Sequence, residues 1–170
     1  MESLRSILEA LIFTAESPLT LEKMCHIMPD VERKTLAETV AALCEEYEKR
    51  GGGLRLCHVA GGYQFRTTDD MAPWVKKMKG TRPVALSMAA LETLAVIAYR
   101  QPIMKSEIER IRGVDVVGVL KTLLEKNLVR IVGRKDVPGR PIIYGTNRKF
   151  LEFFNLRDLS DLPTLKELEG

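Results

Sequence analysis

The side chains best suited to metal binding or nucleophilic catalysis are two Cys-His dipeptides, Cys25-His26 and Cys57-His58. A zinc site needs a second closely spaced ligand pair to complete its tetrahedron, and the sequence offers none. Histidine is otherwise absent, so a nucleophilic serine or cysteine has no evident base as its partner. Carboxylates are scattered along the chain without an aspartate-rich cluster. We therefore predict no metal site, no cofactor and no enzyme activity.

A glycine- and proline-rich stretch, "GRKDVPGRPIIYGTN" (133–147), is the other candidate for chemistry, as a phosphate-binding loop. A P-loop places Gly-x-x-x-x-Gly-Lys-Ser/Thr between a strand and a helix, so that backbone amides meet the phosphate. Here Gly139 is followed by Arg140-Pro141, and the glycines lie between two expected strands. Pro138 and Pro141 fix φ, while Gly139 tolerates positive φ. The pattern favours a rigid hairpin that presents a surface.

Composition describes a globular chain of 170 residues, with 45% hydrophobic and 29% charged side chains. No run of 18 apolar residues exists, and the N-terminus lacks the features of a signal peptide. Three cysteines without a CxxC pair fit a reducing compartment, so we expect a cytoplasmic protein. Residues 81–154 hold 13 basic and 7 acidic side chains, a net charge of +6, whereas residues 1–80 carry −1. That basic region could meet nucleic acid or an acidic protein.

Hydrophobic spacing in residues 1–80 predicts three helices, a hairpin and a closing helix. Ser3 and Thr20 are expected N-caps of the first two helices, and Asp69 of the closing one. The alternating stretch "LRLCHVAGGYQFRT" predicts the hairpin, with Gly61-Gly62 as its turn.

Residues 87–155 repeat the same order after a linker at 81–86. Ser87 and Asp115 are expected to cap the first and third helices, and Asn127 to follow the third in a left-handed conformation. "LVRIVGR" and "PIIYGT" predict two strands, and Asn147 begins a last helix. Residues 156–170 form an acidic tail with regularly spaced leucines, Leu156, Leu159, Leu162 and Leu165. This tail is either a disordered end or a segment that folds against a neighbour.

The two halves are also similar in sequence. "LEALIFTAESPL" aligns with "LETLAVIAYRQPI" at an offset of 83 residues, which becomes 84 after one insertion. Three helices closed by a two-stranded hairpin form a winged helix-turn-helix. We predict a mostly α fold with small β-hairpins (α+β), built from two tandem winged helix-turn-helix domains.

A winged helix reads DNA with polar side chains on its third helix, and this chain offers few of them. The third helix of the second half, "DVVGVLKTLLEKN", provides Lys121 and Lys126, and its equivalent in the first half ends in an acidic run. So few cations give little phosphate-driven affinity. We favour docking to a protein, with a DNA-binding transcriptional regulator as the alternative.

The stretches "YRQPIMKSEIERIRGVD…GVLKTLLEKNLVRIVGRKDVPGRPIIYGT" and "FLEFFNLRDLSDLP" resemble the segregation and condensation protein B family of bacterial SMC-complex subunits. The similarity is dense over residues 86–163, and "EALIFTAESPLT" and "GGYQFRT" extend it into the first half. Val116-Val117 departs from the family pattern, where small polar residues are expected.

This resemblance implies a homodimer formed by the N-terminal domain (1–80) and binding of the kleisin subunit, segregation and condensation protein A, by the C-terminal domain (87–155). The kleisin would link the chain indirectly to the SMC ATPase at the nucleoid, with weak or no direct DNA binding and no membrane contact. Phe150 and Phe154 are expected in the core, and Trp74 suits either the core or the dimer interface. Our candidate kleisin-binding residues are Tyr99, Arg100, Arg134, Lys135, Arg140, Tyr144 and Phe153, and our candidate dimer-interface residues are Leu4, Phe13, Met71, Trp74 and Met78.

Overall fold

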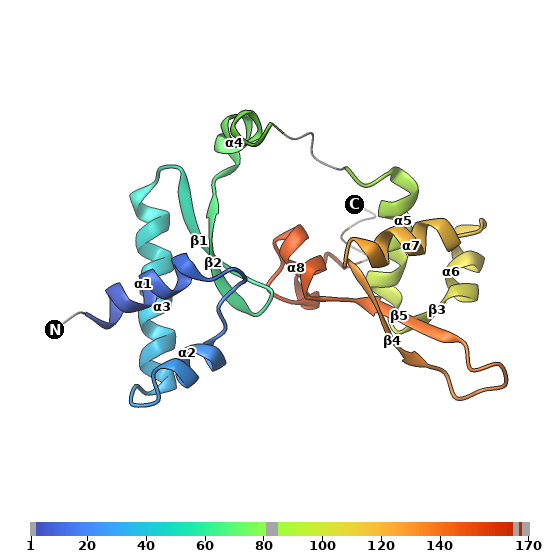
Figure 1. Cartoon of the computed structure of the whole chain (residues 1–170), viewed down its shortest axis with the longest axis horizontal. Helices are drawn as coiled ribbons and strands as arrows, with labels where there is room; N and C mark the ends of the chain where they lie inside the picture. The colour runs from blue at the N-terminus through green and yellow to red at the C-terminus, as the bar shows by residue number, and fades with distance from the viewer. Residues whose placement is uncertain (1–2, 81–84, 165–166, 168–170) are drawn as a thin grey trace. The chain divides into compact units, whose positions relative to one another are not determined.

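The computed structural model describes residues 3–80, 85–164 and 167. Part of the predicted linker, residues 81–84, and Leu165 of the tail lie outside the described residues. The chain divides into a first unit, Met1–Pro83 with Asn155–Gly170, and a second unit, Val84–Phe154. Each unit contains three helices followed by a β-hairpin (Figure 1). The predicted α+β fold with tandem winged helices is confirmed.

Local capping interactions set the helices of the first unit. Ser3 Oγ accepts from the Ser6 amide, and Thr20 Oγ1 accepts from the Lys23 amide, as predicted. The elements are α1 (Leu4–Thr14), α2 (Leu21–Ile27), α3 (Arg33–Arg50), β1 (Leu54–Val59), β2 (Gly62–Thr67), a 3₁₀ turn η1 (Asp69–Met71) and α4 (Ala72–Lys79). Side chains from the three helices and β1 form the core: Leu8, Ile12, Met24, Leu36, Val40, Leu43 and Leu56 are all buried.

Two sequence predictions for the first unit are wrong in detail. The hairpin turn is Ala60-Gly61, because Val59 pairs with Gly62 across the strands. Both turn residues have positive φ, 49° at Ala60 and 70° at Gly61, as a two-residue hairpin loop requires. Asp69 does not cap a helix. It begins η1, and its carboxylate accepts a hydrogen bond from Arg55 at 3.1 Å.

Gly62 is required by a close backbone approach rather than by the turn. A Cβ at this position would lie 2.8 Å from the carbonyl carbon and oxygen of Pro18. We expect Gly62→Ala to lower the free energy of unfolding of the first unit by about 2 kcal/mol, since backbone atoms must move to admit the methyl group. Urea unfolding, followed through amide NMR signals of each unit, measures the effect.

Gly118→Ala is the matched control for this substitution. Gly118 lies in a helix, and a Cβ at this position would meet no atom within 4 Å. Alanine should therefore leave the free energy of unfolding unchanged or raise it by about 0.5–1 kcal/mol. Equal unfolding midpoints for Gly62→Ala and the wild-type chain would contradict the close-approach explanation.

The second unit follows the predicted order with one extra short strand. Its elements are α5 (Met88–Arg100), β3 (Ile103–Met104), α6 (Lys105–Arg112), α7 (Val117–Glu125), β4 (Val129–Arg134), β5 (Ile142–Thr146) and α8 (Arg148–Phe154). Ser87 caps α5, Asn127 is left-handed with φ 55°, and Asn147 Oδ1 accepts from the Lys149 amide at the start of α8, as predicted. Asp115 is not the N-cap of α7. That position belongs to Val116, while the Asp115 carboxylate accepts from the Val117 amide at 3.0 Å.

One backbone pairing supports the internal repeat. In the first unit, Leu19 forms an isolated bridge to Tyr63 of β2. In the second, Ile103 of β3 pairs with Tyr144 of β5, so the sheet has the order β3-β5-β4. Leu19 and Ile103 are separated by the same offset of 84 that aligns the sequences. In both units, therefore, the segment after the first helix pairs with the second strand of the hairpin.

Candidate protein-docking surfaces

The tip of the second unit's hairpin is a stiff, basic turn. The Arg140 amide donates to the Val137 carbonyl at 2.9 Å, which closes a turn with Pro138 and Gly139 at its centre. Gly139 has φ 83°, the value that a type II turn requires after proline. Arg134 Nη1 donates to the Arg140 carbonyl at 3.1 Å and braces the turn. The guanidinium of Arg140 and the ammonium of Lys135 belong to exposed residues at this tip.

Apolar side chains lie among these cations, and sequence reasoning missed them. Ile131, Val132 and Val137 are 52%, 43% and 41% exposed. The pairing of β4 with β5 shifts between Ile131 and Gly133, so both Ile131 and Val132 reach solvent instead of alternating. We call Ile131, Val132, Arg134, Lys135, Val137 and Arg140 the basic wing.

The other candidates in this unit lie at the opposite end of β5. Gln101 follows α5, and its side chain exchanges hydrogen bonds with Thr146, the last residue of β5, at 2.7 Å and 2.9 Å. Exposed Arg100 therefore lies near that end, as does half-buried Tyr99. A five-residue strand spans roughly 16 Å, so this second patch is separate from the basic wing.

Helix α8 adds an aromatic side chain at the same end of β5. Phe153 is 55% exposed and Phe154 is 40% exposed, with ring centroids 5.1 Å apart, while Phe150 is buried as expected. Phe154 thus lies further from the core than predicted. Tyr144 is 8% exposed and pairs with Ile103 and Ile131 within the sheet. Its side chain belongs to the core, so we leave it out of the docking surface.

Three cations of the third helices are paired with acids of the same helix. On α7, Lys121 Nζ lies 3.9 Å from Glu125. On α3, Lys49 lies 3.3 Å from Glu45, and Lys34 lies 3.9 Å from Glu38. Val116 is buried and Val117 is half exposed at the start of α7, where base-reading side chains would stand in a DNA reader. These three pairs balance part of the positive charge that the third helices could offer to phosphates.

A shallow groove of about 320 Å³ opens on the first unit between α1, α3 and the hairpin. Phe13, which is 71% exposed, lies at its rim in a T-shaped contact with Phe65, the ring centroids 6.3 Å apart. Leu54 of β1 is 45% exposed beside it. Leu4 packs partly against the core of the unit. Of the two predicted residues on α1, Phe13 is therefore the one that a partner can reach.

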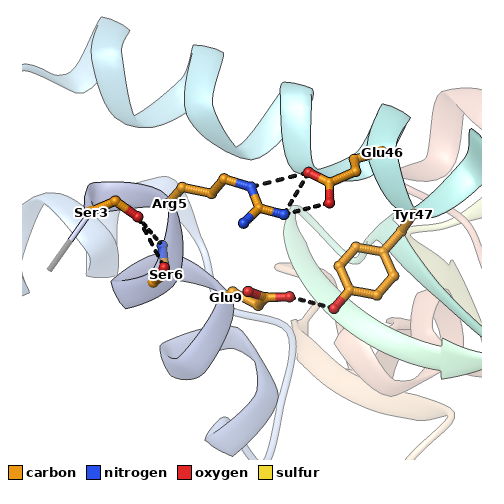
Figure 2. A network of polar contacts seen from close by, with 6 residues as sticks. All are labelled: Ser3, Arg5, Ser6, Glu9, Glu46 and Tyr47. Atoms are coloured by element: carbon orange, nitrogen blue, oxygen red, sulfur yellow. Dashed lines mark hydrogen bonds and ion pairs between the residues drawn. The ribbon is translucent and has the colours of Figure 1, made fainter. Parts of the chain in front are cut away.

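Polar contacts fix α1 against α3 at the edge of this groove (Figure 2). Arg5 Nε donates to Glu46 Oε2 at 3.0 Å, and this carboxylate raises the pKa of the Arg5 guanidinium. Tyr47 donates to the Glu9 carboxylate, which raises the pKa of the Tyr47 hydroxyl together with burial. The groove therefore has a fixed floor and needs little reordering when a partner binds.

Helix α4 presents the remaining candidates for the dimer interface. Trp74 and Met78, one helical turn apart, are 66% and 78% exposed, and no residue of α4 is buried. Lys77 lies over the Trp74 ring at 4.9 Å. Met71, just before α4, is half-buried, and a Cβ at Gly53 would lie 3.3 Å from its Cγ. Because an eight-residue helix is marginal in isolation, α4 is suited to packing against another surface.

The cysteines form no chemical site among the described residues. Burial raises the pKa of the Cys44 and Cys57 thiols, which disfavours the reactive thiolate. Within the described part of the chain, no group of three or more histidine, cysteine or acidic side chains is placed to hold a metal ion. No helix in the same part of the chain is long and apolar enough to cross a membrane.

Comparison with known proteins decides the family. A family model described as "Segregation and condensation complex subunit ScpB" matches residues 6–165. The chain belongs to the ScpB family. The segregation and condensation protein B of Syntrophotalea carbinolica is 53% identical to it over 164 residues, which cover 96% of this chain and 83% of the relative.

Two solved structures of the family are also similar to the chain. ScpB from Mycobacterium tuberculosis is 33% identical, with 90% of this chain and 95% of that chain covered and a TM-score of 0.42. A structure titled as a dimer of the ScpB N-terminal domain complexed with ScpA peptide is 24% identical. It covers 44% of this chain and 91% of its own, with a TM-score of 0.40.

Proposed function

We propose that this ScpB-family chain is a non-catalytic adaptor of a bacterial SMC complex. It forms a homodimer through the first unit and binds the kleisin, ScpA, through the second. It takes part in chromosome condensation and segregation in the cytoplasm and reaches the nucleoid through the complex. The SMC ATPase is contacted indirectly through the kleisin. The chain itself has weak or no direct DNA binding and no membrane contact.

The observation that carries this proposal is the contrast between the two faces of the second winged helix. The face that would read DNA offers Lys121 already paired with Glu125, beside apolar Val117. The basic wing instead combines exposed cations with exposed aliphatic side chains on a stiff turn. Mixed apolar and cationic surface of this kind suits a protein segment that carries both acidic and apolar side chains.

Kleisin binding uses two patches in this proposal. The basic wing supplies Arg134, Lys135 and Arg140, and the opposite end of β5 supplies Arg100 and Phe153, together with half-buried Tyr99. Since the patches lie roughly a strand length apart, an extended segment of about five residues would bridge them. Each patch alone would bind weakly, and the pair together gains affinity from the short connection.

The dimer interface in this proposal comprises Phe13 of α1 and Trp74 and Met78 of α4, with half-buried Met71 just before α4. These exposed aromatic and thioether side chains are the types enriched at the centres of interfaces. Their burial in a second copy would remove apolar surface from water on α4, a helix with no buried residue of its own.

Light scattering after size exclusion tests the proposal. We expect the chain alone to have twice its 19.1 kDa mass, and an equimolar mixture with ScpA to elute as one heavier complex. A monomer that does not co-elute with ScpA would contradict both parts. A dimer without ScpA binding would contradict the adaptor role alone.

A further inference from the structure

The turn of the first unit's hairpin is partly covered, with Gly61 still exposed, although the tip of a wing ordinarily lies in solvent. Val59 is fully buried and Ala60 is 7% exposed. The Ala60 amide donates to the Leu156 carbonyl at 2.8 Å, and the Gly61 amide donates to the Arg157 carbonyl at 2.9 Å. Two adjacent turn amides thus bind two adjacent carbonyls of the C-terminal segment.

The C-terminal segment has internal bonds that hold it in the shape that this contact needs. Asn155 has φ 57°, which reverses the chain after α8. The Arg157 amide donates to the Asp161 carboxylate at 2.7 Å, and Arg157 Nε donates to the same group at 3.0 Å. Asp158 caps the 3₁₀ turn η2 (Leu159–Asp161) through the Ser160 amide at 2.7 Å.

We propose that residues 155–163 are a latch that closes the first unit's wing, with the Ala60-Gly61 turn as its receptor. The occupant is the chain's own C-terminal segment. The chain thereby leaves the first unit, forms the second and returns to the first, so the second unit is attached at both ends. The first wing's tip is not available to a nucleic acid while the latch is bound. This inference does not depend on kleisin binding.

His58 provides an independent sign of the latch beside the turn. Its ring stacks on Tyr63 across the hairpin, with centroids 4.7 Å apart and an interplanar angle of 13°. Burial lowers the pKa of the His58 imidazole, and the nearby charge of Arg157 lowers it further, against the opposing effects of Asp161 and Asp158. The titration of His58 therefore reports whether Arg157 is in place.

Amide exchange in the full-length chain tests the latch through Arg157→Glu, which repels Asp161. We expect the protection of the Ala60 and Gly61 amides against exchange to fall at least tenfold. The Tyr63 amide, which donates to the Leu19 carbonyl at 2.9 Å, should keep its protection. The pKa of His58 should rise, because release of the segment removes the burial and the Arg157 charge that lower it. Arg50→Glu, the same reversal at the end of α3, should change neither quantity.

Several results would overturn the latch. One is exchange of Ala60 and Gly61 in the wild-type chain at the rate of an unstructured peptide. Another is unchanged protection in Arg157→Glu. Loss of protection at Tyr63 as well would show that the segment is needed to fold the hairpin rather than to close it.

A mixture of ¹⁵N-labelled wild-type chain with excess unlabelled Arg157→Glu chain identifies the occupant. If each wing holds its own segment, the labelled Ala60 and Gly61 amides stay fully protected. If the segments are exchanged between copies, most labelled wings receive a variant segment and their amides lose protection. That second outcome would overturn the assignment to the chain's own segment.

Discussion

Replacing Lys135 and Arg140 by glutamate should weaken binding of ScpA at least 100-fold, equivalent to about 2.7 kcal/mol. Both residues are exposed at the tip of the basic wing, so their side chains contribute little to folding. Reversal places two anions where the proposed partner presents acidic side chains, and such like-charge contacts cost several kcal/mol. Isothermal calorimetry with purified ScpA measures the loss.

A double reversal at the C-terminal half of α7 and its cap, Lys121→Glu with Lys126→Glu, is the matched control. It changes the net charge of the second unit by the same amount but leaves the basic wing intact. We expect ScpA binding to stay within about twofold of the wild-type value. Equal losses in both variants would mean that bulk charge, rather than the basic wing, determines the affinity.

Phe13→Glu should convert the dimer to a monomer, with the dimer dissociation constant raised at least 100-fold. Phe13 is 71% exposed, so the monomer should still fold, with an unfolding midpoint lowered only by the loss of the stabilisation that dimerisation gives. In the dimer, however, the new carboxylate would be buried in an apolar interface without a partner, which is strongly unfavourable. Sedimentation equilibrium gives the dissociation constant.

Ile27→Glu is the control for Phe13→Glu. Ile27 lies on α2, is 43% exposed and is not among the proposed interface residues. This variant should remain a dimer. A monomeric Ile27→Glu variant, or a dimeric Phe13→Glu variant, would place the interface elsewhere on the first unit.

The fold could be predicted where local interactions decide it. Ser3, Thr20 and Ser87 cap their helices through bonds to amides three residues ahead, which sequence spacing reveals directly. The hairpin turn was misplaced by one residue because two glycines are adjacent and either could turn. Glycine is required at position 62 because the backbone of Pro18 lies close to it. These residues are 44 positions apart, so no local sequence pattern reveals the contact.

Residues of the candidate surfaces were harder to predict than the elements that carry them. Tyr144 follows two isoleucines in β5, and a run without polar alternation does not say which side chain faces the core. The shift in pairing next to Ile131 brings Val132 to the surface, and bulges leave no reliable sequence signal. Phe153 was predicted as the more exposed of two adjacent rings, and it is. The binding roles of all these residues remain predictions.

The latch also lay beyond sequence reasoning, for a different physical reason. Its two hydrogen bonds join residues about 96 positions apart, and both use backbone atoms, so side-chain identity says nothing about them. From the sequence, the tail could be either a disordered end or a segment folded against a neighbour. In the structure, residues 155–164 are described and fold against the hairpin of the first unit.

The central claim is that the second winged helix has kept the shape of a DNA reader while its exposed surface serves a protein. Fluorescence anisotropy with labelled ScpA and with labelled duplexes, in the same buffer at 50 mM and 200 mM salt, tests it most directly. We predict that ScpA binds with or without excess duplex, and that duplex binding is weak, independent of sequence and lost at the higher salt. Tight, sequence-dependent duplex binding that displaces ScpA and disappears with Lys121→Glu and Lys126→Glu would contradict the account.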